Sequence, residues 1–137
     1  MREIKFRGIR RDNKEFVYGD GIHFPKSINY KGRCYIDGMQ EKANDWMEVM
    51  PETVGQYTTI DAYKSNTETE NIYKGDIVEI VCDEIGYTIP QNFRGEVKFV
   101  EGKWVVDDGK KLVDLWQELA QWIILGNIYE NLELLEE

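Results

Sequence analysis

The side chains that most often bind metals or act as nucleophiles are few and far apart in this chain. It has one histidine, His23, and two cysteines, Cys34 and Cys82. A zinc site needs about four Cys, His or carboxylate ligands, usually with two of them a few residues apart. No such spacing occurs, and two cysteines do not make a disulfide framework. We therefore expect no metal and no cofactor, and we expect both cysteines to be small buried core residues.

Adjacent carboxylates are the other candidates for acid–base chemistry. They occur at Asp83-Glu84, Asp107-Asp108 and Glu136-Glu137. Neighbouring side chains on a strand point to opposite faces, and carboxylates in turns are usually solvated. Neither a Gly-rich phosphate loop nor a Ser–His pair accompanies them. The sequence therefore predicts no catalytic residues and a protein that is not an enzyme.

Charge is unevenly distributed along the chain. There are 17 basic and 26 acidic side chains, a net charge of −9. Residues 1–33 carry nine basic and four acidic side chains, whereas residues 34–137 carry eight basic and 22 acidic ones. Such an acidic surface repels nucleic acid. Nucleic acid is therefore not the expected partner, with the basic N-terminal segment as the exception to consider.

Five basic side chains and one tyrosine are candidates for an interaction surface: Arg2, Lys5, Arg7, Arg10, Arg11 and Tyr57. The basic residues could bind nucleic acid or an acidic partner. Alternatively, Lys5 and Arg7 simply occupy the solvent face of a strand whose other face carries Ile4 and Phe6. A third interpretation is a homo-oligomer, in which the basic segment of one subunit meets the acidic part of another.

The basic residues fall on a predicted N-terminal hairpin. Ile4 and Phe6 alternate with charged residues, as in a half-buried strand. A turn signal at 11–14 separates them from a returning strand over 16–22. A loop of three or five residues would place Ile4 and Phe6 on the same face as Phe16, and a loop with an even number of residues would not. Both registers remain open.

The next part of the chain predicts short strands and then a polar segment. The strands are expected at 28–30, 33–36 and 46–50. Residues 61–71 form the most polar stretch, which predicts a loop or a boundary between two halves. The expected organisation is a β-rich region over 1–60, a polar loop over 61–71 and a second β region over 72–137.

The strongest strand signals follow the polar segment. Residues 77–81 form a β-branched apolar run typical of a buried strand. Glu101-Gly102 predicts a two-residue turn that pairs Phe99 with Trp104 and Val97 with Val106. A last strand is expected at 122–125, and a helical turn at 132–137.

One segment of this half has helical spacing. Residues 110–121 place Leu112, Leu115, Trp116 and Leu119 at i, i+3, i+4 and i+7. The pattern predicts a short amphipathic helix beside the strands. The expected fold class is therefore mainly β, with a minor α component.

Four stretches of the sequence together resemble the YopX family of phage and prophage proteins. They are Met1 to Arg7 with Val17-Tyr18-Gly19-Asp20, Pro51 to Thr58, Ile72 to Val78, and Ile124 to Asn131. They run in the family's order across nearly the whole chain. Within them, the residues that carry the family signature are Thr53, Gly55, Gln56, Tyr73, Gly75, Asp76, Gly126 and Asn127.

The resemblance implies a phage or prophage origin. It also implies an irregular β-rich N-terminal part and a small SH3-like barrel in the C-terminal half. It implies no activity and no catalytic residues. The signature residues are therefore interpreted as structural.

Three hypotheses for function follow. The first is a non-enzymatic accessory protein that binds an unidentified protein partner and self-associates. The second is a nucleic-acid-binding module that uses the basic hairpin, and the third is an acidic mimic of DNA. No apolar run approaches the roughly 20 residues of a membrane helix, so we expect no membrane partner and a location in the cytosol of the bacterial host.

Overall fold

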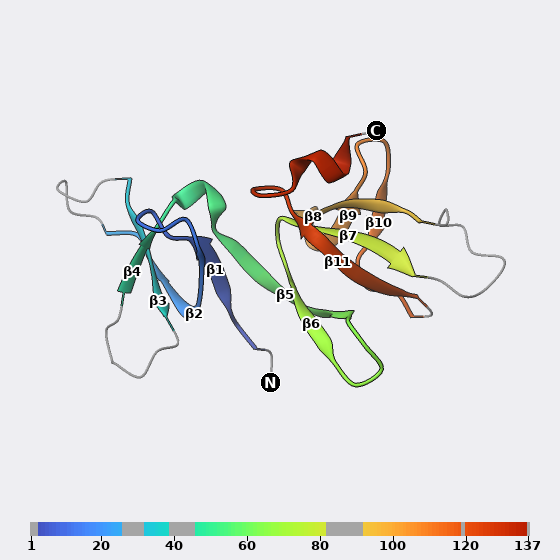
Figure 1. The fold of residues 1–137 in the computed structure, drawn as a ribbon, viewed down its shortest axis with the longest axis horizontal. Helices are drawn as coiled ribbons and strands as arrows, with labels where there is room; N and C mark the ends of the chain where they lie inside the picture. Colours follow the sequence, from blue (N-terminus) through green and yellow to red (C-terminus); the bar gives the residue numbers. More distant parts are fainter. Residues whose placement is uncertain (1–2, 26–31, 39–45, 82–91, 119, 137) are drawn as a thin grey trace. The chain divides into compact units, whose positions relative to one another are not determined.

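Two compact units make up the chain in the computed structural model, which describes residues 3–25, 32–38, 46–81, 92–118 and 120–136. The units are Met1–Tyr57 and Thr58–Glu137. Both are built from antiparallel strands, and no α-helix occurs in the described ranges (Figure 1). Strand β5 (Gly55–Tyr63) begins in the first unit and continues in the second. The mainly β fold class is confirmed.

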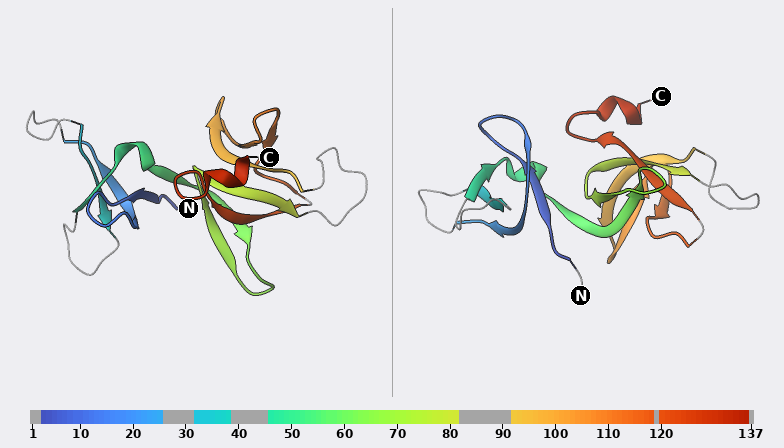
Figure 2. Two further views of the ribbon diagram at one scale, coloured as in Figure 1. Left: turned by 45° about the horizontal axis from the view of Figure 1, so that its top comes forward. Right: turned by 60° about the horizontal axis from the view of Figure 1, so that its bottom comes forward.

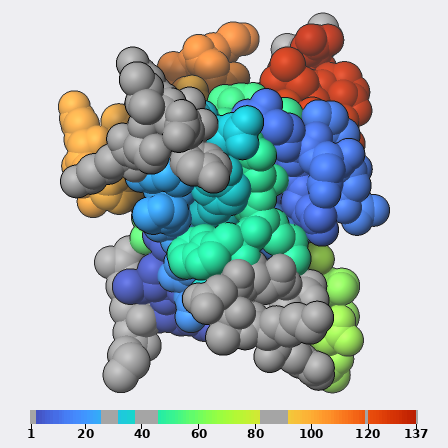
Figure 3. Space-filling model, turned by 90° about the vertical axis from the view of Figure 1, so that its left-hand side faces the viewer, coloured from blue at the N-terminus to red at the C-terminus, as the bar shows by residue number. Residues whose placement is uncertain are grey.

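The first unit is built on a curled six-stranded sheet of order β4-β3-β2-β1-β5-β6, whose last strand, β6 (Thr69–Tyr73), belongs to the second unit. Its strands are β1 (Phe6–Ile9), β2 (Phe16–His23), β3 (Cys34–Gly38) and β4 (Trp46–Val49). Arg10 and Val49 form a bridge, and Met50 N donates to Ile9 O at 2.9 Å. The sheet therefore curls until β4 reaches the end of β1. In the space-filling view the cyan and green residues of β3 and β4 adjoin (Figure 3).

The loop of the N-terminal hairpin has an even number of residues. Ile9 pairs with Phe16, so the connection is residues 10–15. Ile4 is 55 % exposed, whereas Arg7 is only 5 % exposed. Of the two registers left open, the one that places Ile4 toward the core and Arg7 toward solvent is therefore excluded. The Arg7 guanidinium carbon lies 4.5 Å from the centroid of the Phe16 ring, and such stacking lets a weakly hydrated guanidinium be buried where alternation alone predicts exposure.

A small core fills the first unit. Its buried members are Val17, Cys34, Ile36 and Val49. A Cβ on Gly8 would lie 3.0 Å from two carbons of the Val49 side chain, so β1 passes close to this core. Burial raises the pKa of the Cys34 thiol, as expected for an inert core cysteine. Cys82 and the strand expected at 28–30 lie outside the described residues.

The second unit contains the end of β5, its partner strand β6 and a five-stranded sheet of order β10-β9-β8-β7-β11. Figure 2 shows the strands of this sheet in yellow-green, orange and red. The strands are β6 (Thr69–Tyr73), β7 (Asp76–Val81), β8 (Arg94–Val100), β9 (Lys103–Asp107), β10 (Leu112–Asp114) and β11 (Gln121–Asn127). The polar stretch 61–71 is only partly a loop, because β5 runs to Tyr63 and β6 begins at Thr69.

The predicted β8–β9 hairpin is confirmed residue by residue. Phe99 pairs with Trp104, and Val97 pairs with Val106. Glu101 and Gly102 have φ values of 51° and 83°. Two successive positive φ values characterise the turn that matches the right-handed twist of a hairpin.

The amphipathic helix predicted over 110–121 is wrong. Leu112–Asp114 form β10, which pairs with β9. Val113 and Leu115 are 7 % and 0 % exposed, whereas Leu112 and Trp116 are 50 % and 66 % exposed. The period is therefore two, and the helical spacing of the leucines is coincidental. The Asp108 side chain accepts hydrogen bonds from the N–H groups of Lys110 and Lys111, which turns the chain back along β9.

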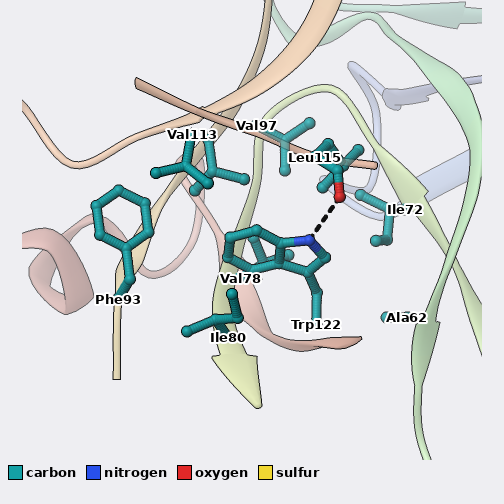
Figure 4. Close-up of a cluster of buried hydrophobic side chains, with 10 residues drawn as sticks. Ala62, Ile72, Val78, Ile80, Phe93, Val97, Val113, Leu115 and Trp122 are labelled. Atoms are coloured by element: carbon teal, nitrogen blue, oxygen red, sulfur yellow. Dashed lines mark hydrogen bonds between the residues drawn. The ribbon is translucent and has the colours of Figure 1, made fainter. Parts of the chain in front are cut away.

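The core of the second unit is larger and contains two aromatic rings. Its buried members are Ala62, Ile72, Val78, Ile80, Phe93, Val97, Val106, Val113, Leu115 and Trp122. Trp122 is 2 % exposed, and its Nε1 donates to Leu115 O at 2.6 Å (Figure 4). A 3-10 turn at Leu132–Leu135 confirms the expected helical turn near the C-terminus.

Candidate functional site

Lys5 and Arg7, the first two basic candidates among the described residues, make contacts within the first unit. Lys5 Nζ lies 3.0 Å from Glu3 Oε1 and 5.7 Å from the centroid of the Tyr57 ring. Tyr57 is 5 % exposed, and its N–H donates to Lys5 O at 2.9 Å. Arg7 is buried against Phe16. Neither Tyr57 nor Arg7 therefore presents a surface to a ligand, and Arg2 lies outside the described residues.

Arg10 and Arg11 are engaged by carboxylates. The Arg10 guanidinium makes two hydrogen bonds to Asp12, at 3.0 and 2.7 Å, and these lower the pKa of the Asp12 carboxyl. Arg11 Nε lies 3.0 Å from Glu48 Oε2, which is also 3.8 Å from Arg33 Nε. A phosphate group would have to compete with these carboxylates. Arg10 and Arg11 of the basic hairpin are therefore held in surface ion pairs.

The signature residues of the first unit hold β1 in place. Thr53 is 4 % exposed; its Oγ1 accepts from Ile9 N at 2.9 Å and donates to Met50 O at 2.6 Å. Gly55 and Gln56 pair with Arg7 and Phe6. The first and second of the four family stretches therefore form one structural element.

The signature residues of the second unit build a tight turn into β7. Asp76 is 2 % exposed and accepts a hydrogen bond from Tyr73 N at 2.8 Å. Gly75 has a φ of +93°, and a Cβ placed there would lie 3.2 Å from the Tyr129 ring. Gly75 O also accepts from Ile128 N at 2.9 Å. The turn therefore packs directly against the last of the family stretches.

Asn127 closes the same arrangement from β11. It pairs with Asp76 across the sheet. Its Oδ1 accepts from the N–H groups of Tyr129 and Glu130, each at 3.0 Å, and its Nδ2 donates to Glu130 Oε1. A Cβ on Gly126 would lie 2.4 Å from Asn131 Oδ1. Gly126 and Asn127 therefore fix the turn that follows β11.

The carboxylate pairs do not form an acid–base site in the described chain. Asp107 Oδ2 lies 2.9 Å from Lys98 Nζ, which lowers the pKa of Asp107 and raises that of Lys98. Backbone N–H groups lower the pKa of Asp108. Both carboxylates therefore serve the turn and the sheet. Asp83-Glu84 and Glu137 lie outside the described residues.

No group of three or more His, Cys, Asp or Glu side chains among the described residues is arranged to hold a metal ion. Within the same residues, no helix is long and apolar enough to cross a membrane.

Exposed aromatic side chains are the feature that sequence analysis missed. Phe99 is 54 % exposed and Trp116 is 66 % exposed in the second unit, and Phe24 and Trp46 are 58 % and 41 % exposed in the first. The sequence pattern placed Phe99 on an apolar face and Trp116 on a helix face. The sequence carries no local signal that distinguishes these exposed rings from core residues.

The fold defines a small antiparallel β protein in which the signature residues lie in strands, in the turn before β7 and in the 3-10 turn before β5. No curated protein and no solved structure matches the chain significantly. A comparison with protein families matches residues 5–136 to YopX protein. The match covers nearly the whole chain, so the chain belongs to the YopX family.

Proposed function

We propose that this YopX-family protein is a non-enzymatic phage or prophage accessory protein that acts in the host cytosol by binding another protein. The observation that carries the proposal is the exposure of Phe99 and Trp116. Large aromatic side chains are enriched at protein interfaces and dominate their binding energy. The signature residues support the fold, which leaves such surface residues as the candidates for recognition.

We also propose that the second unit is an SH3-like barrel. In its sheet β7, β8, β9 and β10 are consecutive neighbours, and β11 returns to pair with β7. A curled five-stranded sheet with this order is compatible with a small barrel whose interior is filled by side chains. With this assignment, the exposed rings of Phe99 and Trp116 lie on the surface of the barrel.

Affinity capture from host lysate, followed by mass spectrometry, tests the proposed function. Specific recovery of one protein partner, confirmed with the purified pair, is the expected result. Recovery of no partner, together with a monomer by light scattering, would overturn it.

Binding of nucleic acid by the basic hairpin has less support, because Arg7 is buried and Arg10 and Arg11 lie against carboxylates. Fluorescence anisotropy with single- and double-stranded DNA and RNA at low salt distinguishes the two proposals. Salt-sensitive binding that is lost in Arg11→Ala would favour nucleic acid.

Mimicry of DNA by the acidic half is also less well supported. A mimic needs a regular row of unpaired acids. Here Glu79 lies 3.2 Å from Arg94, and Lys98 lies between Glu96 and Asp107. Local cations thus interrupt the acidic surface.

A further inference from the structure

The outer face of the sheet in the first unit carries aromatic side chains from adjacent strands. Tyr35 on β3 pairs with His23 on β2 and with Glu48 on β4. Cys34 and Ile36, which precede and follow Tyr35, are fully buried in the core. Successive side chains of a strand point to opposite faces, so Tyr35 and both of its cross-strand partners point away from that core.

Trp46 lies on the same face, one row of residues along the sheet. It pairs with Asp37, two residues after Tyr35, and Asp37 pairs in turn with Gly21. A Cβ placed on Gly21 would lie 3.4 Å from Cη2 of the Trp46 indole. The indole therefore extends from β4 over β3 to β2, a span of two strand spacings, or roughly 10 Å. Because Gly21 has no side chain, the ring can lie along the sheet, and Trp46 remains 41 % exposed.

His23 connects the two rows of this face. The ring centroids of His23 and Trp46 are 5.7 Å apart, at an interplanar angle of 54°. Tyr35 lies directly opposite His23 in the register and is half-buried, whereas His23 is exposed. We call His23, Tyr35 and Trp46 the ring face. The pairing of the three strands fixes the backbone beneath every ring, so little conformational entropy opposes binding there.

The ring face has little net charge. Glu48, at one end, is paired with Arg11 at 3.0 Å and with Arg33 at 3.8 Å. Asp37 is the exception, because no cation among the described residues lies within ion-pair distance of it. A phosphate backbone would meet this carboxylate, which disfavours nucleic acid as the ligand. A two-fold dimer through the ring face would bring the Asp37 carboxylates of both copies into one interface, which also opposes association.

The polar atoms of the ring face can all donate hydrogen bonds. The Trp46 indole has an N–H, the Tyr35 phenol an O–H, and the His23 imidazole at least one N–H. A proline-rich segment is complementary, because proline has a carbonyl acceptor but no backbone N–H. In the polyproline II conformation these carbonyls make no internal hydrogen bonds. The pyrrolidine rings are apolar and uncharged, so they can pack on the exposed indole.

A proline-rich segment also loses little entropy when it binds. The polyproline II helix exists before binding, and such segments dock against aromatic side chains in several classes of recognition module. This chain has three prolines, Pro25, Pro51 and Pro90, which lie far apart in the sequence. It therefore contains no proline-rich segment that could occupy the ring face, and the occupant belongs to a different protein.

We propose that the ring face binds a proline-rich segment of a partner protein in the polyproline II conformation. A pyrrolidine ring packs on the Trp46 indole, and carbonyl groups of the segment accept hydrogen bonds from Tyr35 and His23. An arginine next to the prolines pairs with Asp37. The ring face goes beyond the proposed function, which rests on exposed rings of the second unit.

The test uses the full-length protein and three fluorescent peptides. They are decaproline followed by one arginine, decaproline alone, and a Gly-Ser repeat of equal length followed by one arginine. Fluorescence polarisation should show binding of both proline peptides and none of the Gly-Ser peptide. The arginine should strengthen binding about threefold, as expected for one exposed ion pair. Added salt should remove that advantage and leave the binding of decaproline unchanged.

Four variants assign the binding to the ring face. Trp46→Ala should weaken the proline peptides about tenfold. Gly21→Val places a branched side chain where the indole lies, and it should weaken them although Trp46 is retained. Asp37→Asn should abolish the advantage of the arginine without changing the affinity for decaproline. Phe99→Ala removes an exposed ring from the second unit and is the control that should leave both affinities unchanged.

Nuclear magnetic resonance of the unaltered protein avoids any effect of a variant on folding. Titration with decaproline should shift the indole N–H signal of Trp46 and leave that of Trp122, which is buried in the second unit, unmoved. An unmoved Trp46 signal, equal binding of the Gly-Ser peptide, or no binding of the proline peptides would overturn the proposal. Salt-sensitive binding of a ten-thymidine DNA strand in place of the proline peptides would assign the ring face to nucleic acid and overturn it as well.

A partner captured from host lysate separates the ring face from the proposed function. If a captured partner binds Trp46→Ala as tightly as the unaltered protein, and decaproline does not bind, protein binding stands and the ring face is wrong. If decaproline binds through Trp46 but lysate yields no partner, the ring face stands and the proposed function is wrong. If a captured partner loses about tenfold in affinity for Trp46→Ala and when its own prolines are replaced by alanine, both stand.

Discussion

Among the described residues, the buried cluster of the first unit has four members, whereas that of the second unit has ten. The first unit compensates with polar contacts: Thr53 ties Ile9 to Met50, and the Arg7 guanidinium is buried on Phe16. The cluster of the second unit contains more apolar side chains among the described residues, and they include the rings of Phe93 and Trp122. Small domains bury a smaller fraction of their surface and are correspondingly marginal. The comparison indicates that the first unit is the less stable of the two.

Core truncation gives the largest expected effect. Ile36→Ala in the first unit and Leu115→Ala in the second should each cost about 2–5 kcal/mol, because both side chains are fully buried. The first unit has less apolar burial to lose, so Ile36→Ala should remove hydrogen-exchange protection from β1 to β4 and spare β7 to β9. Mass spectrometry of exchanged peptides measures this. Equal loss in both units would show that they unfold as one and would break the comparison.

Two of the three indole N–H groups of the second unit, those of Trp104 and Trp122, offer a sharper test of apolar against polar stabilisation. Trp122→Phe should cost about 1–3 kcal/mol, because it removes the hydrogen bond to Leu115 O and leaves that carbonyl buried. Trp104 Nε1 is buried and has no hydrogen-bond partner within the described part of the chain. Trp104→Phe should therefore cost clearly less in urea denaturation. A larger cost at Trp104 would contradict the assignment.

Thr53 tests how far the first unit depends on one hydroxyl. Thr53→Val keeps the shape but deprives Ile9 N of its acceptor, and it should cost about 1–2 kcal/mol. Thr53→Ser keeps the hydroxyl and is the control. Chemical denaturation followed by circular dichroism measures both. A valine variant as stable as the serine variant would show that the hydrogen bond is not needed.

The smallest effect concerns the Lys98–Asp107 pair. The lowered pKa of Asp107 means that its pairing stabilises the fold above the ordinary value of 3.8 and that this contribution is lost as pH falls through the folded-state pKa. Lys98→Met should raise the pKa of Asp107, measured by carboxyl NMR titration. It should also flatten the acid side of the stability profile slightly, since the pair is partly exposed. An unchanged Asp107 titration would contradict this.

Strand periodicity and turn chemistry in the sequence predicted much of the fold. The Glu101-Gly102 turn specified its hairpin because two positive φ values in succession admit few residue types. The prediction of a helix over 110–121 was wrong because Leu112, Leu115 and Trp116 match a helical spacing by chance. Pairing with β9 decides the conformation of this segment. The burial of Arg7 was not predicted for a related reason. Phe16, an aromatic residue on the neighbouring strand, changes the environment of the Arg7 guanidinium.

The candidate site was predicted less well. Residue type drew attention to Arg10 and Arg11, but their carboxylate neighbours, Asp12 and Glu48, became evident only in three dimensions. The exposed rings of Phe99 and Trp116 could not be distinguished from core residues by sequence. The exposure of a side chain depends on whether another part of the chain packs over that end of the sheet, and a local sequence pattern does not encode this.

Strand β5 has a practical consequence for any attempt to dissect the protein. The boundary between the units falls between Tyr57 and Thr58, within a single strand. Cutting there would separate Gly55, which pairs with Arg7, from Thr58, whose Oγ1 donates to Ile72 O at 2.9 Å. Fragments for separate expression should therefore overlap, with each one carrying its own copy of residues 55–63.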